Sequence, residues 1–166
     1  MRIFKEEQRF TQTWLLVIIS FSTLIPLAII IKEFSEKQEG MSQSELIISI
    51  LGVLLAAGLI FIFKLETRID ENGIHYKFFP FHLKMKTIKW ENIKKAYVRN
   101  YDPIGEYGGW GLKGGAFWNK SKGRAINVSG TVGIQLELKN GKKILIGTHK
   151  EQDAKQVLVS YANKTQ

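Results

Sequence analysis

Two long runs of apolar residues stand near the start of the chain. Residues 13–31 and residues 46–63 contain no Lys, Arg, Asp, Glu or His. At about 1.5 Å per residue, each run is roughly 27–29 Å long as a helix, close to the roughly 30 Å hydrocarbon core of a bilayer. Backbone polar groups in lipid must be satisfied within the segment, so both runs are predicted to be transmembrane helices. Residues 32–45 then form a short external linker.

Three other interpretations of these runs remain open. Residues 1–31 could be a signal peptide, although the apolar run is long for one and no A-x-A-like site follows it. Both runs could be core helices of a soluble protein, which would need a larger body to cover them. One run could also span the membrane while the other lies at its interface.

After Phe63 the apolar residues alternate with polar ones, which is typical of strands with one buried face. Asn72-Gly73 and Asn140-Gly141 supply tight turns because these residues tolerate positive φ. Residues 102–115 are glycine-rich and predicted to be irregular. Eight segments are candidates for strands, of which about seven strands are expected in all. The segments are 65–70, 74–78, 83–88, 93–101, 116–118, 124–128, 132–138 and 143–147.

The chain ends with a helical pattern. Ala154, Val157, Leu158 and Tyr161 follow at i, i+3, i+4 and i+7, as in an amphipathic helix packed on one side. Thr148 and Glu151 have the spacing of a capping box before it. The predicted fold class is therefore α+β, with a transmembrane helical hairpin and then, in residues 64–166, an antiparallel sheet bent into a half-open barrel that the last helix caps.

The distribution of charge adds an orientation. The net charge is +9, and residues 64–166 hold 19 Lys and Arg against 9 Asp and Glu, a local net charge of +10. The linker has two Lys against four Glu, whereas residues 1–12 carry three basic side chains. Because cytoplasmic segments are enriched in Lys and Arg, the N-terminal tail of residues 1–12 and the C-terminal domain are both predicted to be cytoplasmic, in a multi-pass protein of the cell membrane.

This order of elements resembles a known fold. Seven strands and a closing helix are similar to the pleckstrin-homology-like (PH-like) fold, and two preceding membrane helices resemble an uncharacterised family of small bacterial membrane proteins with such domains. The segments YDPIGEYGGWG at 101–111, VGIQL at 132–136 and GKKILIGT at 141–148 look like motifs of these proteins. The resemblance implies a fold and an arrangement, and it carries over no activity.

The glycine-rich segment is the first candidate for a contact surface with a protein partner. Glycines let a backbone approach a partner closely, and aromatic side chains supply contact area. The alternative is structural, with the glycines at positive φ and the two aromatic rings plugging the barrel. The residues concerned are Tyr107, Gly108, Gly109, Trp110 and Gly111.

Two further sets of residues are candidates for other contacts. A basic set is predicted to face the anionic inner leaflet of the lipid bilayer, the alternative being a merely solvated positive face. Its members are Lys64, Arg68, Lys84, Lys86 and Lys89. A small-residue set, Gly52, Ala56 and Gly58, is predicted to let another helix approach closely. A second basic cluster around Trp118 is not taken to bind nucleic acid, because any cytosolic domain beside a membrane carries such charge.

Residues for catalysis are not evident. The chain has no Cys, which excludes disulfides and thiolate ligands, and its three His residues lack metal-binding spacing. No cofactor or metal is expected. The leading hypothesis is a membrane-anchored, non-catalytic interaction module that binds the inner leaflet, a protein partner or a second copy of itself. The alternatives are an auxiliary subunit of a transporter or membrane enzyme, joined through the helices, and a membrane enzyme.

Overall fold

The computed structural model describes residues 3–36, 41–114 and 120–164. The chain divides into two compact units, which we describe separately. One unit is Phe10–Phe63, and the other joins Met1–Arg9 to Lys64–Gln166. The strand expected at residues 116–118 lies outside the described residues.

The first unit is a pair of helices, α1 (Thr13–Glu36) and α2 (Gln43–Gly58), and α2 continues into a short 3-10 turn, Leu59–Ile62. The apolar runs therefore lie in helices, apart from Phe63, which follows the second one. These helices have 24 residues and, with the 3-10 turn, 20 residues, and by length and composition both could cross a membrane. Neither helix contains a buried residue. A capping box that the sequence analysis did not predict starts α2, where Ser42 and Glu45 exchange hydrogen bonds.

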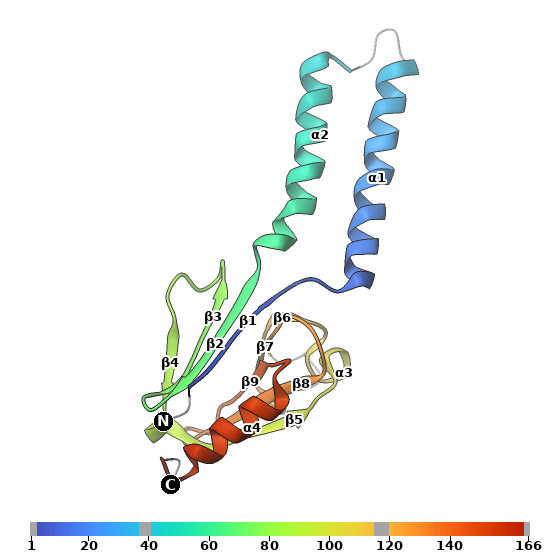
Figure 1. Cartoon of the computed structure of the whole chain (residues 1–166). Helices are drawn as coiled ribbons and strands as arrows, with labels where there is room; N and C mark the ends of the chain where they lie inside the picture. Colours follow the sequence, from blue (N-terminus) through green and yellow to red (C-terminus); the bar gives the residue numbers. More distant parts are fainter. Residues whose placement is uncertain (1–2, 37–40, 115–119, 165–166) are drawn as a thin grey trace. The chain divides into compact units, whose positions relative to one another are not determined.

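The second unit contains two open sheets rather than a closed barrel (Figure 1). The first sheet is antiparallel, in the order β1 (Phe4–Arg9), β2 (Lys64–Asp70), β3 (Gly73–Phe79) and β4 (Lys86–Lys89). The second has the order β5-β8-β9-β7-β6, formed by β5 (Ile93–Asn100), β6 (Gly111–Lys113), β7 (Arg124–Asn127), β8 (Val132–Leu138) and β9 (Lys143–Gly147). Two α-helices complete it, α3 (Pro103–Tyr107) and α4 (Glu151–Ser160). Its described residues also form short 3-10 turns at Trp90–Asn92, Lys120–Lys122 and Ala162–Lys164.

The N-terminal segment belongs to this second unit. Residues 1–12 are predicted to be a cytoplasmic N-terminal tail without a strand, whereas Phe4–Arg9 forms β1 and pairs with β2 from Phe4↔Ile69 to Arg9↔Lys64. The helical unit is thus inserted between two neighbouring strands of one sheet. The strand was missed because Glu6 and Gln8, which are polar, lie on its buried face with Phe4.

Those two inward polar side chains attach β1 to the end of β9. Glu6 accepts hydrogen bonds from the Thr148 hydroxyl at 2.6 Å and the His149 amide at 2.8 Å. Gln8 donates to the Gly147 carbonyl at 2.8 Å. The capping box expected at Thr148 and Glu151 is wrong, since Thr148 donates to Glu6 and α4 begins without a side-chain cap.

The core lies between the two sheets and under α4. Ala154, Val157, Leu158 and Tyr161 are all buried, which confirms the predicted inner face of the last helix. Trp90, also buried, stacks on Tyr161 at 5.2 Å and donates its indole N–H to the Asp70 carbonyl. Fully buried aliphatic residues fill the rest: Leu65, Ile69, Ile74, Ile93, Val128, Ile134, Leu136 and Leu145.

Two other expectations need correction. The second sheet is not wholly antiparallel, because β7 pairs with β9 in parallel, from Arg124↔Ile144 to Ile126↔Ile146. The segment 102–115 is not irregular throughout, because α3 and β6 lie within it. Asn72-Gly73 and Asn140-Gly141 do lie at hairpin connections, as predicted. The positive φ expected of the Asn residues is wrong, because among the described residues only glycines have positive φ, and Gly73 already pairs with Asp70 as the first residue of β3.

If β1 is part of the folded domain, its buried aromatic residue should contribute to stability. Phe4 is 3% exposed. Phe4→Ala should lower the free energy of unfolding by about 3–5 kcal/mol, as for other buried Phe residues. Lys5→Ala, at the exposed neighbouring position, is the control and should change it by less than about 0.5 kcal/mol. Denaturant unfolding of the detergent-purified protein measures both, and equal effects would contradict the assignment of β1 to the domain.

Candidate functional site

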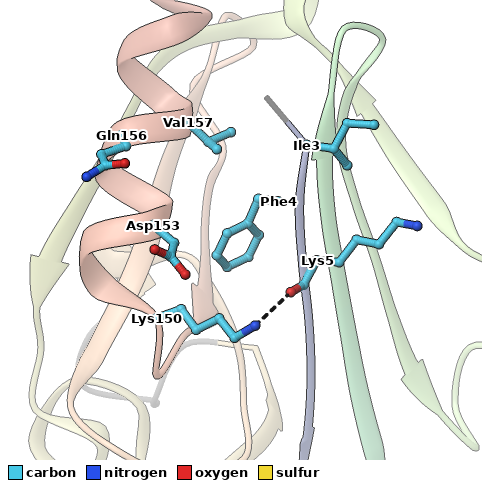
Figure 2. A pocket seen from close by; sticks show the side chains of 7 residues that line it. All are labelled: Ile3, Phe4, Lys5, Lys150, Asp153, Gln156 and Val157. Carbon is cyan, nitrogen blue, oxygen red and sulfur yellow. Dashed lines mark hydrogen bonds between the residues drawn. The ribbon is translucent and has the colours of Figure 1, made fainter. Parts of the chain in front are cut away.

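A hollow of about 610 Å³ lies between β1 and α4 (Figure 2). Phe4 projects into the space between the strand and the helix, and the Lys150 ammonium donates to the Lys5 carbonyl at 3.2 Å. The remaining charged group in its wall is Asp153, so the charges there are of both signs. The few charged groups in the wall of this hollow do not converge on a common point where a ligand could bind. The hollow is therefore not the candidate site.

The two aromatic residues of the predicted contact surface, Tyr107 and Trp110, have different environments in the structure. Tyr107 is 2% exposed, and its ring lies edge-on to Tyr101 at 6.0 Å. Gly108 ends α3 in the left-handed conformation, at φ 73°, and Gly109 and Gly111 also have positive φ. Trp110 is half-buried and donates to the Gly130 carbonyl. Tyr107 is therefore part of the core, whereas Trp110 keeps a partly exposed surface.

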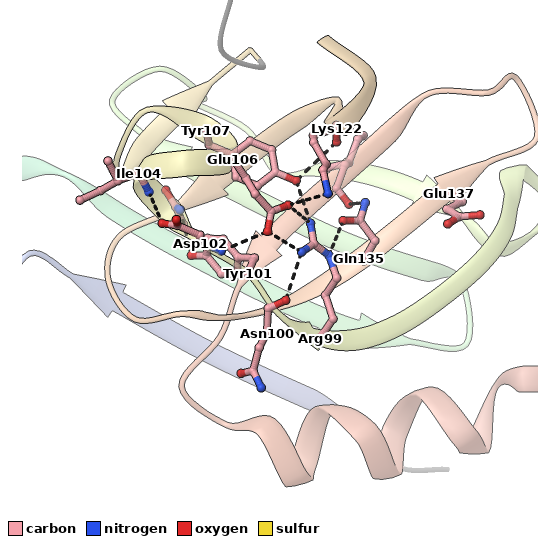
Figure 3. A network of polar contacts seen from close by, with 12 residues as sticks. Arg99, Asn100, Tyr101, Asp102, Ile104, Glu106, Tyr107, Lys122, Gln135 and Glu137 are labelled. Carbon is pink, nitrogen blue, oxygen red and sulfur yellow. Dashed lines mark hydrogen bonds and ion pairs between the residues drawn. The ribbon is translucent and has the colours of Figure 1, made fainter. Parts of the chain in front are cut away.

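An ion pair attaches α3 to the second sheet (Figure 3). The Arg99 guanidinium donates two hydrogen bonds to the Glu106 carboxylate, at 3.0 and 2.8 Å, and one to Gln135. Lys122 lies 3.4 Å from the same carboxylate. The hydrogen bonds from Arg99, helped by the Asp102 amide, lower the pKa of Glu106 to about 2. These groups satisfy one another, which indicates a structural network.

The five predicted membrane-facing cations do not act as one group. Lys64 pairs with Glu66 at 2.6 Å, Arg68 with Asp70 at 2.9 Å, and Lys89 with Glu91 at 3.5 Å. Their positive charge is offset locally. Lys84 and Lys86 have exposed side chains and form no ion pair with a carboxylate within the described ranges.

Lys86 instead belongs to a different cluster. Two hollows of about 490 and 440 Å³ share Gly114, Arg124 and Ile144, and we call their combined surface the basic cleft. Among the described residues, no Asp or Glu lines it, and none of its cations forms an ion pair with a carboxylate. The cations are Lys86, Lys113, Arg124, Lys142 and Lys143.

Neutral polar groups lie beneath these cations. Burial raises the pKa of Tyr76, an effect that the nearby Arg124 charge opposes. Burial and the charge of Lys86 lower the pKa of His82. The His82 Nδ1 accepts a hydrogen bond from the Phe78 amide, so the neutral ring has its N–H on Nε2. A cleft with several unpaired cations around neutral side chains is suited to bind an anion.

The small-residue set of α2 is not buried against α1. A methyl group built on Gly52 or on Gly58 would meet no atom within 4 Å. Ala56 lines a hollow of about 360 Å³ between the two helices, opposite Ser22 and Thr23. This part of α2 is therefore not covered by any neighbouring element among the described residues.

One pair of side chains has a form known from hydrolases. Ser129 and His149 are 2.6 Å apart, Oγ to Nε2. Neither residue lines the basic cleft or the hollow between β1 and α4. A nucleophile needs an accessible site and a group that orients its base, and the contacts within the described residues supply neither. In the same residues, no group of three His, Cys, Asp or Glu could hold a metal ion.

The basic cleft was not found in the sequence analysis because its members come from three distant segments. Lys86 begins β4, and Lys113 and Arg124 flank residues 114–123. Lys142 directly precedes β9, and Lys143 is the first residue of that strand. The parallel pairing of Arg124 with Ile144 brings the last two groups together. The sequence did give local signals, since Lys86 belongs to the predicted basic set and Lys113 and Arg124 belong to the second basic cluster around Trp118. Local spacing does not show that these residues and Lys142 and Lys143 meet in one cleft.

Neither the comparison with protein-family models nor the search of curated proteins found a match for this chain.

The Arg99–Glu106 pair should make stability depend on pH. The pKa of Glu106 falls from an ordinary 4.5 to about 2 in the folded protein, so the pair stabilises fully above about pH 5 and less as the pH drops toward 2. Glu106→Gln should lower stability at neutral pH and flatten this acid-dependent loss. Glu91→Gln, which removes an exposed carboxylate, should leave the profile unchanged. Unfolding midpoints between pH 2 and 7 measure the difference, and parallel profiles for the wild type and Glu106→Gln would contradict the assignment.

Proposed function

We propose that this protein is a membrane-anchored, non-catalytic interaction module whose domain binds anionic lipid headgroups on the cytoplasmic leaflet. The observation that carries the proposal is the basic cleft, with five cations and no lining carboxylate among the described residues. In this proposal the two helices span the cell membrane and the domain lies directly at its inner surface.

The pairing of β1 with β2 supports the proposed topology. β1 precedes α1 and β2 follows α2, and the two strands are neighbours along their full length. If α1 and α2 cross the membrane, this pairing requires both chain segments to lie on the same side of it. The charge excess of the domain and the acidic linker then favour the cytoplasmic side.

The PH-like fold remains part of the proposal. The four-stranded first sheet, the second sheet and the helix α4 packed against β1, β5 and β8 support it. The insertion of the helices between β1 and β2, and the parallel β7–β9 pair, are departures from the expected simple order. A PH-like fold would not by itself imply lipid binding, so the proposed function rests on the cleft.

The position of the cleft favours a ligand at the membrane surface. Lys86 and Phe81 line the cleft, and both lie in or beside the connection from β3 to β4. Phe79, the last residue of β3, pairs with Lys64, the first residue after the helical unit. The cleft thus includes the end of the first sheet at which the chain leaves for the helices.

The charge of the cleft is large enough to matter. A basic side chain near an anionic leaflet contributes about 1 kcal/mol to the free energy of binding to that leaflet. Even half of the five cations of the cleft would therefore favour binding to the membrane surface. Such an attraction weakens as salt screens it, over roughly 10 Å at 0.1 M ionic strength.

A second function is an auxiliary subunit assembled through the helices. The open positions at Gly52 and Gly58 and the hollow between α1 and α2 favour this proposal, since small residues permit close helix packing. Purification in mild detergent should then yield a complex with a second membrane protein, and a protein that purifies alone would count against it.

The headgroup proposal predicts a local charge effect. Soluble short-chain phosphatidylglycerol should raise the thermal unfolding midpoint of the detergent-purified full chain, and added salt should reduce the rise. Arg124→Gln with Lys143→Gln removes two cations of the cleft and should abolish most of this stabilisation. Differential scanning calorimetry measures the midpoints, with short-chain phosphatidylcholine as the neutral comparison.

The matched control removes the same charge elsewhere. Lys94→Gln with Lys95→Gln neutralises two exposed cations of β5 that do not line the cleft. This variant should respond to phosphatidylglycerol as the wild type does. If both double variants lose the response equally, the effect is one of net charge, and the cleft is not the binding site.

A further inference from the structure

The connection between β3 and β4 exposes apolar side chains to an unusual degree. Phe81 is 62% exposed, Leu83 76% and Met85 41%. Single exposed apolar residues are common on protein surfaces, but three in five consecutive positions are not expected on a face that meets only water. We call residues 80–85 the apolar loop.

The register of the first sheet places this loop at one particular end. The loop follows Phe79, which pairs with Lys64, and Lys64 pairs in turn with Arg9. Lys64 and Arg9 are the residues at which the chain enters and leaves the helical unit. The tip of the β3–β4 hairpin and the start of β2 accordingly lie at the same end of the first sheet (Figure 1).

The loop is held in a defined shape. The His82 amide donates to the Phe78 carbonyl at 2.8 Å, and the Phe78 amide donates back to the His82 ring. His82 is buried against Tyr76, and the Phe81 ring stacks on Phe78 at 6.0 Å. The turn is therefore fixed to the core at residues 78 and 82. Leu83, the next residue, is exposed on a turn of defined conformation.

Basic residues alternate with the apolar ones. Lys84 and Lys86 flank Met85, and both have exposed side chains. An interfacial membrane segment has this composition, with apolar side chains that enter the acyl boundary and cations that meet the headgroups. Leu112, 38% exposed, lines the basic cleft together with Phe81, so the apolar loop and the cleft adjoin each other.

From this placement we infer that the apolar loop inserts Phe81 and Leu83 into the leaflet that the helices enter, as a third membrane contact of the chain. The occupant of this surface is the lipid bilayer itself. The inference rests on the proposed function, because it requires the domain to lie on the membrane. It adds an apolar contact to the electrostatic one, and that contact does not depend on anionic lipid.

Single-cysteine labelling tests the insertion, since the chain has no Cys of its own. Leu83→Cys, labelled with an environment-sensitive nitrobenzoxadiazole dye, is reconstituted as the full chain into vesicles of phosphatidylcholine and phosphatidylglycerol. The dye should show blue-shifted emission, strong quenching by lipids with a nitroxide near the glycerol backbone, and weak quenching by aqueous iodide. Val159→Cys on α4 is the matched control, because Val159 is also 76% exposed. Its dye should behave as in water.

The outcomes separate this inference from the proposed function. If the dye at 83 is quenched by iodide as strongly as the dye at 159, the loop does not insert and the inference is overturned. That result would leave the phosphatidylglycerol response of the cleft intact. If lipid nitroxides quench the dye at 83 in pure phosphatidylcholine vesicles as well, insertion is supported. If the full chain is at the same time not stabilised by phosphatidylglycerol, the headgroup proposal fails while the insertion stands.

Discussion

The antiparallel pairing of β1 with β2 joins two chain segments that the whole helical unit, Phe10–Phe63, separates in sequence. Six residue pairs and the side-chain bonds of Glu6 and Gln8 hold β1 in place. The domain consequently cannot be completed until both helices have been made. If the helices cross a membrane, as we propose, the pairing also requires Arg9 and Lys64 to lie on the same side of it.

Several features of the domain gain a common explanation from that constraint. The strand ends at Arg9, Lys64 and Phe79 lie together, and the apolar loop starts from them. The basic cleft adjoins this loop through Phe81 and Lys86. Other cations of the domain differ: Arg99 and Arg68 are paired with Glu106 and Asp70, whereas Lys94 and Lys95 form no ion pair within the described residues. What distinguishes the cleft and the apolar loop is that several cations and an exposed apolar segment adjoin there, as expected for a face that meets headgroups and acyl chains.

The sequence predicted the elements with strong periodicity and missed those whose pattern depends on tertiary contacts. The apolar helices, the Asn-Gly hairpins and the inner face of α4 follow from local spacing alone. β1 was missed because Glu6 and Gln8 are buried polar residues, satisfied by groups at 147–149 that the sequence cannot place beside them. The cleft was missed for a similar reason, since a parallel β7–β9 pair joins its two halves. Tyr107 looked like a contact residue because burial of an aromatic ring in a glycine-rich segment leaves no periodic signal.

A cross-link between β1 and β2 tests the central pairing most directly. Glu7 and Glu66 are register partners, and the chain is otherwise free of Cys. Glu7→Cys with Glu66→Cys should form a disulfide in intact membranes under mild oxidation. With a protease site inserted at residues 37–40, cleavage after solubilisation should leave the two pieces joined until reductant is added. In the control variant, Glu7→Cys with Glu91→Cys, the two pieces should separate without reductant. If the pieces of the Glu7→Cys, Glu66→Cys variant also separate without reductant, the pairing and the orientation derived from it are contradicted.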